Sequence, residues 1–341
     1  MKNNVLRFLP ATLTVILMLA LLLCLEPLSA NAATAPWPKP EVTEFKMGLP
    51  ANDANFLPSW AAEQRGFFKE EGFTDFKILV FQGDAPTVQA LAAGTVDLVV
   101  ASLTGLVNSI TAGQRFKAVW GGYNMAHFEW YGLPKYKSIA ELKGGRLGIS
   151  RFGSMTDFLT RYALRKAGIN PEKDVTLLAL GGSAQFLAAL AAGQLDASIL
   201  SIPNTYTAVE RGYVRLATQR DLVSPDYPTH IVFSKEEFIA KNPNTIKAYL
   251  RATSRAMEWI KANPDEAAKL VNKQMKFDVD HARKGINDVA YGWAPDGRLP
   301  QEAGMKVFWS IAVDAGDVKE PWPPSRWLDD SFLKTQGEWR K

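Results

Sequence analysis

The residue types that most often carry out catalysis are sparse in this sequence and do not occur at catalytic spacings. The chain of 341 residues contains three histidines, His127, His230 and His281, and a single cysteine, Cys24. It contains no His-Glu-x-x-His pair, no Gly-x-Ser-x-Gly elbow, no P-loop and no Gly-x-Gly-x-x-Gly fingerprint. These features favour a protein that binds a ligand without transforming it, so we predict no enzyme activity, no metal and no cofactor.

Polar side chains recur where a predicted strand passes into a helix, and the strongest case is the stretch from Arg151 to Thr156. Ligands of open α/β sheets bind beyond the carboxyl ends of strands, where helix N-termini expose unpaired N–H groups and a partial positive charge. Gly153 lets the backbone approach a ligand, and Ser154 and Thr156 offer hydroxyl groups. Arg151 could add a guanidinium for a carboxylate, sulfonate or phosphate. The stretch predicts an anion site, with a plain Ser/Thr helix cap and an exposed arginine as the alternative.

The other predicted strand ends supply further candidate contacts. Asn55 could hydrogen-bond a ligand and Phe56 could stack on one, just after the first predicted strand. Tyr123 and Trp293 favour a ligand with a ring or another apolar portion, although most aromatic residues belong to protein cores. The predicted ligand-binding residues are Asn55, Phe56, Thr104, Tyr123, Arg151, Gly153, Ser154, Met155, Thr156, Ser183, Pro203, His230 and Trp293.

A near-repeat predicts how these strand ends come together. Residues 90–97 read Ala-Leu-Ala-Ala-Gly-Thr-Val-Asp, and residues 189–196 read Ala-Leu-Ala-Ala-Gly-Gln-Leu-Asp, 99 residues later. A repeat of this length indicates one α/β half-domain used twice rather than a solenoid unit. Two such halves that face each other form a cleft, and the register pairs strand ends such as Ser102 and Ser201.

Strands and helices alternate in both halves, which is the pattern of an α/β fold. Near-continuous apolar runs such as 96–101 are typical of strands that are covered on both faces. Asp84 is the expected N-cap of the helix after the second strand. We predict a two-lobed fold, each lobe a mostly parallel sheet flanked by helices, with the ligand between the lobes. Predicted strands are 45–49, 76–81, 96–101, 116–120, 146–150, 175–180, 197–200 and 214–217, and predicted helices are 58–68, 86–93, 104–112, 156–167, 184–192, 205–211, 242–260 and 264–274.

Two stretches that contain Pro and Gly divide the chain into lobes. We expect hinge crossovers near residues 131–135 and 224–230. The first lobe then comprises residues 41–131 and 230–341, because the mainly helical C-terminal third returns to pack on it. Residues 134–228 form an inserted second lobe. Three consecutive domains are the alternative.

The first 32 residues have the features of a secretory signal peptide. A basic start and an apolar run from 13 to 25 precede the sequence Ala-Asn-Ala, which predicts cleavage after Ala32. An uncleaved membrane anchor is the alternative. Lipid attachment at Cys24 is disfavoured because Leu23 stands where a small residue is normally required. The formal net charge of +4 and the absence of a basic run mixed with aromatics exclude nucleic acid as the expected partner.

Several segments carry a resemblance to a known family. Residues 136–150 read Tyr-Lys-Ser-Ile-Ala-Glu-Leu-Lys-Gly-Gly-Arg-Leu-Gly-Ile-Ser, and they are supported by 61–73, 168–175 and 189–196. In order and spacing, these segments resemble the periplasmic solute-binding proteins of ABC transporters, in the nitrate/sulfonate/taurine and NMT1/THI5-like group. The stretch 136–150 resembles the entry to the second lobe of those proteins.

The resemblance implies a type II periplasmic binding protein fold that captures a small solute in the periplasm and presents it to an inner-membrane permease with its ATPase. Together with the predicted anion site, it favours a small organic anion, such as a sulfonate or carboxylate, and a protein that acts as a monomer. A periplasmic enzyme and a sensory ligand-binding domain on the same fold are the alternatives. Pyrimidine-synthesising relatives rely on a cysteine-rich stretch, which the predicted mature chain lacks.

Overall fold

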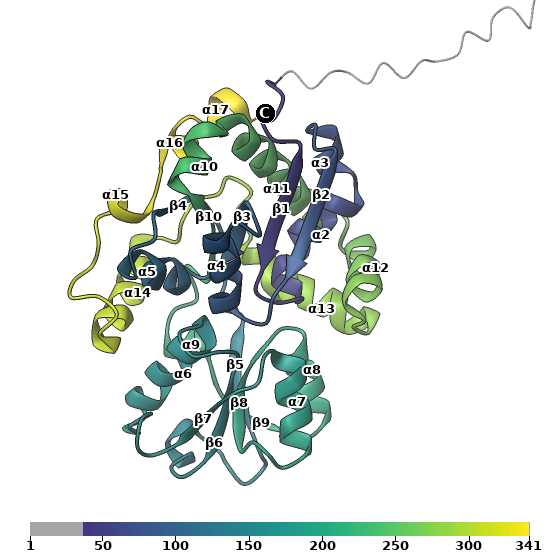
Figure 1. Ribbon diagram of the computed structural model, residues 1–341. Coiled ribbons are helices and arrows are strands. Elements are labelled where there is room, and N and C mark those ends of the chain that lie inside the picture. Colours follow the sequence, from purple (N-terminus) through teal and green to yellow (C-terminus); the bar gives the residue numbers. More distant parts are fainter. Residues whose placement is uncertain (1–36, 341) are drawn as a thin grey trace, which may run out of the picture. The chain divides into compact units, whose positions relative to one another are not determined.

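Two five-stranded sheets organise the part of the chain that the computed structural model describes, residues 37–340 (Figure 1). The first sheet has the strand order β2-β1-β3-β10-β4, and the second has the order β7-β6-β8-β5-β9. In each sheet one strand, β10 or β5, runs antiparallel to both of its neighbours. The sheets therefore share one topology, in agreement with the sequence repeat. The strands are β1 (Glu44–Leu49), β2 (Asp75–Val80), β3 (Leu98–Ala101), β4 (Phe116–Tyr123), β5 (Phe128–Gly132), β6 (Arg146–Ile149), β7 (Thr176–Ala179), β8 (Ala197–Ser201), β9 (Val214–Thr218) and β10 (His230–Lys235).

Helices flank both sheets, which confirms the predicted α/β class. We call the first sheet with its helices the first lobe, and the second sheet with α6 to α9 the second lobe (Figure 1). The helices are η1 (Ala54–Phe56), α2 (Leu57–Gln64), α3 (Phe67–Glu70), α4 (Asp84–Ala93), α5 (Leu103–Thr111), η2 (Ile139–Glu141), α6 (Met155–Lys166), α7 (Ser183–Ala191), α8 (Asn204–Glu210), α9 (Gln219–Leu222), α10 (Glu236–Lys241), α11 (Pro243–Ala262), α12 (Pro264–Met275), α13 (Val279–Val289), η3 (Ala290–Gly292), α14 (Glu302–Ala315), α15 (Pro324–Trp327), α16 (Ser331–Lys334) and α17 (Gln336–Trp339).

The central strand β3 shows why its sequence is apolar throughout. All four of its residues are buried. Leu98 and Val100 pack in the core that contains α2 and α11, whereas Val99 and Ala101 pack in the core that contains α5. Since successive strand residues point to opposite faces, a sheet covered on both sides requires apolar residues at every position.

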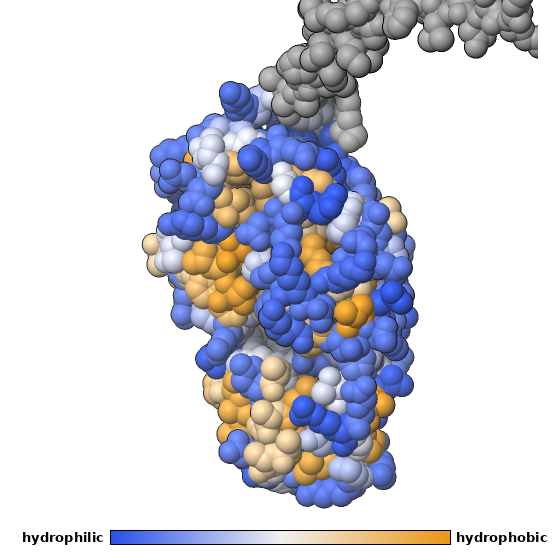
Figure 2. All heavy atoms as spheres, turned by 90° about the vertical axis from the view of Figure 1, so that its right-hand side faces the viewer, coloured by the Kyte–Doolittle hydropathy of each residue, from blue (hydrophilic) through white to orange (hydrophobic). Residues whose placement is uncertain are grey.

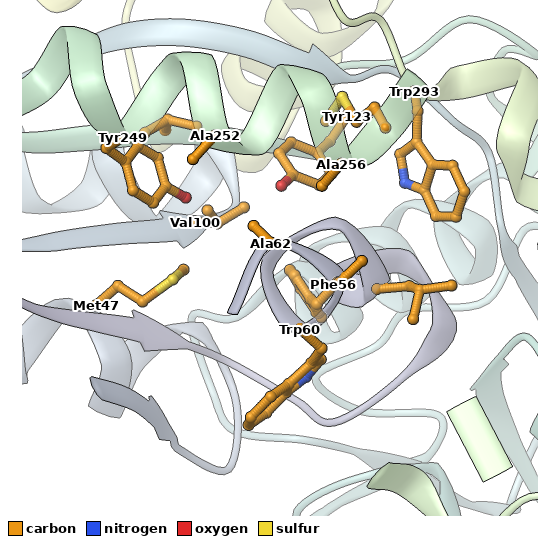
Figure 3. Packing of buried hydrophobic residues seen from close by; sticks show 14 of the residues in the cluster. Met47, Phe56, Trp60, Ala62, Val100, Tyr123, Tyr249, Ala252, Ala256 and Trp293 are labelled. Carbon is orange, nitrogen blue, oxygen red and sulfur yellow. The ribbon is translucent and has the colours of Figure 1, made fainter. Parts of the chain in front are cut away.

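The long helix α11 shares one hydrophobic core with the first sheet and with α2 and α3. Its residues Tyr249, Ala252 and Ala256 are fully buried and point toward Val100 of β3 and Met47 of β1 (Figure 3). The same helix packs most extensively against α2 and α3. The C-terminal helical part of the chain is therefore joined to the first lobe through this core.

The exchange of strands between the lobes corrects the predicted boundary at residue 131. Strand β5 pairs with β8 and β9, so residues 128–132 belong to the second sheet and not to the first. The chain crosses between the sheets at 124–127 and returns at 223–229, where β10 follows. The predicted boundary lies too late in the chain because the turn residues Gly132 and Pro134 mark the end of β5 and not the crossing between the sheets.

A second correction concerns the predicted helix 58–68. It consists of α2 and α3, separated by Gly66, which has φ +76°. This left-handed conformation ends an α-helix and is accessible to glycine without steric cost. The apolar residues were assigned correctly, but the break was missed.

Helix α14 adds an apolar contact between the lobes. The ring of Phe308 lies 5.9 Å from that of Phe158 on α6 and 6.1 Å from that of Tyr227 in the returning connection. On the face shown in Figure 2, hydrophilic residues surround separate hydrophobic areas. No helix within residues 37–340 is long and apolar enough to span a bilayer. The predicted signal peptide, its cleavage site after Ala32 and the disfavoured lipid site at Cys24 lie outside the described residues.

Candidate functional site

A cavity of about 60 Å³ lies between the two lobes, at the carboxyl ends of the parallel strands. Open α/β sheets bind ligands at this edge. Both lobes contribute to its wall through the loop after β1, the first turns of α4, α6 and α7, and the first residues of β5 and β10. A space of this size accepts a few water-sized groups, which favours a small solute. The lining residues are Pro50, Ala51, Asp53, Phe56, Gly83, Asp84, Phe128, Ser150, Met155, Thr156, Gly181, Gly182, Ser183, Phe186, Ser201 and His230.

The wall of the first lobe is built around His230, the first residue of β10. Its Nδ1 atom lies 2.7 Å from Nδ2 of Asn55, and its ring meets the edge of Phe56 at 4.7 Å between centroids. With the Asn55 amide placed in this orientation, Nδ2 donates to Nδ1, which assigns the ring proton to Nε2. The backbone of Asn55 is held in turn by Trp293, whose Nε1 donates to the backbone carbonyl oxygen of Asn55 at 3.1 Å. Asn55 and Trp293 thus orient the imidazole.

Asp53 forms the acidic part of the same wall. It is 6% exposed and caps the short helix η1, where its Oδ1 atom accepts a hydrogen bond from Asn55 N at 3.0 Å. Burial raises the pKa of Asp53 to about 7, although the bonds from Asn55 N and the Ser201 side chain act in the opposite direction. A carboxyl group that changes its charge near neutral pH therefore faces the cavity.

The second lobe contributes hydroxyl groups at the starts of two helices. Thr156 Oγ1 accepts a hydrogen bond from Ser150 N at 2.9 Å and lies 2.7 Å from Ser150 Oγ. Ser183 Oγ similarly accepts from Ser201 N at 3.0 Å and lies 3.1 Å from Ser201 Oγ. These paired hydroxyls tie the end of a strand to the first turn of a helix. Their positions at helix N-termini suit a hydrogen-bond acceptor on a ligand.

Asp84 links the two lobes and corrects its predicted role as a helix cap. The N-cap of α4 is Gly83, and Asp84 is the first residue of the helix. Its Oδ1 atom accepts from Ser102 N at 2.9 Å in the first lobe, and its Oδ2 atom accepts from Met155 N at 3.0 Å in the second. Burial raises the pKa of Asp84, while the two backbone bonds lower it. The carboxylate thus accepts a hydrogen bond from one of the otherwise free N–H groups at the start of α6.

The lobes also approach closely at Gly83. This residue has φ +106°, and a Cβ atom placed on it would lie 3.2 Å from the hydroxyl oxygens of both Ser150 and Ser154. Ser154 Oγ also accepts a hydrogen bond from Ala85 N at 3.4 Å. Glycine is therefore required here both by the backbone conformation and by the facing lobe.

The cavity has no positively charged side chain among its described lining residues. Burial lowers the pKa of His230 to about 3, so its imidazole is neutral at physiological pH. Arg151, predicted to hold an anion, donates instead to Ser150 O at 3.0 Å and to Gln82 Oε1 at 3.4 Å. It does not line the cavity. The charge that this wall can carry is therefore negative rather than positive.

Five of the thirteen predicted contact residues line the cavity: Phe56, Met155, Thr156, Ser183 and His230. They stand at the first residue of a strand or within the first turn of a helix, where the strand-end reasoning placed them. The eight predicted residues that do not line the cavity are Asn55, Thr104, Tyr123, Arg151, Gly153, Ser154, Pro203 and Trp293.

Five of those eight residues lie in the surrounding structure as follows. Tyr123 and Trp293 are at most 1% exposed and lie in the core under α11 (Figure 3). Thr104 is buried within the first turn of α5, and Pro203 lies beside Gly285 of α13. Gly153 is exposed and donates its N–H to Asp157. The strand-end pattern led to the loops and helix starts that wall the cavity but did not specify which side chains turn inward.

The sequence reasoning missed several lining residues, including Asp53, Phe128, Ser150, Phe186 and Ser201 as specific contacts. Ser201 and Asp53 occurred at expected strand ends, so a systematic reading of the last strand residue and the following loop would have included them. Phe128 was not selected because no strand was predicted at its position, and the predicted boundary assigned it to the first lobe. Among residues 37–340, no group of three or more His, Cys, Asp or Glu side chains could hold a metal ion.

Comparison with known proteins agrees with this architecture. A model of the NMT1/THI5-like family matches residues 53–267, which is more than half of the chain. The chain belongs to the NMT1/THI5-like family. It is 26% identical over 315 residues to the nitrate/nitrite binding protein NrtA of Nostoc sp., covering 83% of this chain and 69% of the relative.

The fold is shared with a solved structure as well. The periplasmic aliphatic sulphonate binding protein SsuA of Escherichia coli has a TM-score of 0.66 and 17% identity, covering 84% of this chain and 92% of that protein. A yeast relative of a different kind, the 4-amino-5-hydroxymethyl-2-methylpyrimidine phosphate synthase THI12, is 24% identical over 256 residues, covering 69% of this chain and 70% of the relative. The binding proteins confirm the predicted fold and the resemblance to solute-binding proteins of ABC importers.

Proposed function

We propose that this protein is the substrate-binding component of an ABC importer. It captures a small organic solute in the periplasm and delivers it to an inner-membrane permease that works with its ATPase. The observation that carries the proposal is a small cavity walled by both lobes in a chain related to a nitrate/nitrite binding protein. Export by a signal peptide cleaved near Ala32, and action as a monomer, belong to the same proposal.

The second lobe supports a solute with a carboxylate, sulfonate or similar acceptor group. Thr156 and Ser183 stand in the first turns of α6 and α7, and helix N-termini favour negative charge. The rings of Phe56, Phe128 and Phe186 line the same cavity and support an apolar or aromatic portion next to that group. The predicted class, a small organic anion, is therefore retained for this end of the solute.

The two connections between the lobes, 124–127 and 223–229, are the proposed hinges. The bond from Met155 N to Asp84 joins the lobes directly, so opening of the cleft breaks it. A solute that contacts both lobes binds more tightly to the closed form and shifts the population toward it. The closed pair of lobes is then the form that the permease recognises.

No chemical step is part of the proposal. The hydroxyl groups of Ser183 and Ser201 are hydrogen-bonded to each other, and those of Ser150 and Thr156 form a second pair. None of these hydroxyls is bonded to His230, whose Nδ1 is engaged by Asn55. The Ser201 hydroxyl also neighbours the carboxyl of Asp53, and the proposal assigns both groups to solute binding.

Native mass spectrometry of protein purified without refolding tests the function directly. We expect a one-to-one complex with a carried-over small molecule, and added solute should raise the melting temperature, because a ligand at 100 times its Kd stabilises the folded state by about 2.7 kcal/mol. The variant Ala51→Phe, which places a ring in the cavity, should abolish this shift. Conversion of the bound molecule into a product by the purified protein would refute the proposal in favour of an enzyme.

A further inference from the structure

We propose that the solute also donates a hydrogen bond, from an amino or amide N–H group, to the carboxylate of Asp53. This inference rests on the proposed function, because it concerns the same cavity. It narrows the solute from a simple organic anion to a neutral or zwitterionic molecule, in which an N–H group lies against the first lobe and an acceptor group lies against the second.

The surroundings of Asp53 leave it able to accept more hydrogen bonds. The side chain is 6% exposed, and its Oδ1 atom receives Asn55 N at 3.0 Å. The Ser201 side chain is its other hydrogen-bonding neighbour. Two carboxylate oxygens provide about four acceptor positions, so two neighbours do not use this capacity fully. A buried carboxylate is costly unless donors surround it, and a solute N–H group is the missing donor.

His230 provides an independent indication of a ligand. Its side chain is 3% exposed and lines the cavity, and Nδ1 is engaged by Asn55. Nε2 is the ring nitrogen that Asn55 leaves unused. The neutral ring donates from Nε2, so one wall of the cavity offers a donor on His230 and an acceptor on Asp53. An amide group, which has an N–H beside a carbonyl, matches both.

The charge balance points in the same direction. Asp53 and Asp84 place two carboxyl groups in the wall, and neither lysine nor arginine is among the described lining residues. Asp84 already uses Met155 N, which removes one N–H of α6 from an incoming anion. A simple anion would add negative charge without a cationic partner, and such a charge is disfavoured in a partly dehydrated site. A solute N–H group removes this disadvantage.

Three matched probes separate the possibilities: butanoate, 4-aminobutanoate and butanamide. Their binding to the full protein is measured by ligand-observed NMR and calorimetry at pH 8, where the carboxyl of Asp53 is ionised. We expect at least one N–H probe to bind about tenfold more tightly than butanoate, since a hydrogen bond to a charged group is stronger than one between neutral groups. Asp53→Asn should remove this preference, and Asp53→Ser provides a second test if the first variant does not fold. Asp314→Asn, on the exposed side of α14, is the matched control.

Each outcome is decisive for one of the two proposals. Tighter binding of butanoate than of both N–H probes to the wild-type protein overturns the inference and leaves the proposed function intact. An unchanged preference in folded Asp53 variants also overturns it. A carried-over solute with an N–H group supports the inference, and one without such a group contradicts it. If no probe binds and no solute is carried over, the proposed function fails together with the inference.

Discussion

Replacement of Asp53 by asparagine should change how the stability of the protein depends on pH. Burial raises the pKa of this carboxyl from 3.8 to about 7 in the folded protein. Between these values the folded state holds a proton that the unfolded chain has released. The free energy of unfolding therefore falls by about 1.4 kcal/mol per pH unit as the pH rises toward 7, and is level above it. From pH 5 to pH 8 the carboxyl accounts for a loss of about 3 kcal/mol.

Urea denaturation of the ligand-free protein, followed by the fluorescence of its ten tryptophans, measures this effect. Between pH 5 and pH 8 we expect wild type to lose about 3 kcal/mol more unfolding free energy than Asp53→Asn loses. Asp314→Asn is the control for loss of one surface carboxylate and should follow the wild type. The reasoning is refuted if the unfolding free energies of wild type and Asp53→Asn depend on pH in the same way. The same dependence means that their difference changes by less than about 1 kcal/mol, which is on the order of the experimental error.

Four further substitutions test other parts of the structure. Asp84→Asn weakens the interlobe bond to Met155 N and should lower solute affinity at least about tenfold by calorimetry; unchanged affinity contradicts the proposed closure. Thr156→Val keeps the side-chain shape but leaves Ser150 N without its acceptor, so urea denaturation should show a loss of about 1–3 kcal/mol. Phe308→Ala should cost about 3–5 kcal/mol in the same assay, and a cost below 1 kcal/mol, on the order of a surface substitution, would argue against a packed interlobe contact. Burial, together with the nearby His230, lowers the pKa of His127 from 6.5 to about 3, so the folded state loses stability as the pH falls below 6.5. His127→Phe should remove about 3 kcal/mol of the stability loss between pH 6.5 and pH 4. An unchanged decrease of the unfolding free energy over this pH range would contradict the assignment.

Local sequence patterns were sufficient for most of the secondary structure. The predicted strand 146–150 corresponds to β6, and the predicted helix 156–167 corresponds to α6 within one residue at each end. Such elements are recognised because apolar spacing and terminal glycines act within a few residues of each other. Strands β5 and β10 were missed because each pairs, antiparallel, with strands from distant parts of the chain. Nothing in a window of ten residues records such a pairing.

The sequence patterns led to part of the cavity wall but not to the charged side chain that faces the cavity. Strand-end reasoning led to Thr156, Ser183 and His230, which line the cavity. It also selected Arg151 as the charged partner of the solute. The structure turns Arg151 toward Gln82 and Ser150 instead, and it presents Asp53 to the cavity. A helix cap and a ligand contact have the same residue types in sequence, so only the facing lobe distinguishes them.

The sequence by itself determined that the protein has two similar α/β halves, the approximate positions of most of their strands and helices, and to which family the chain is similar. These properties depend on short-range periodicity, on turn residues and on ordered motifs along the chain. Only the tertiary structure decided which strand ends meet and which side chains turn inward. It also decided that the cleft is acidic, with Asp84 joining the lobes through Met155 N. The physical reason is that the direction and charge state of a side chain depend on burial and on partners from distant segments, as the contact between Asn55 and His230 illustrates.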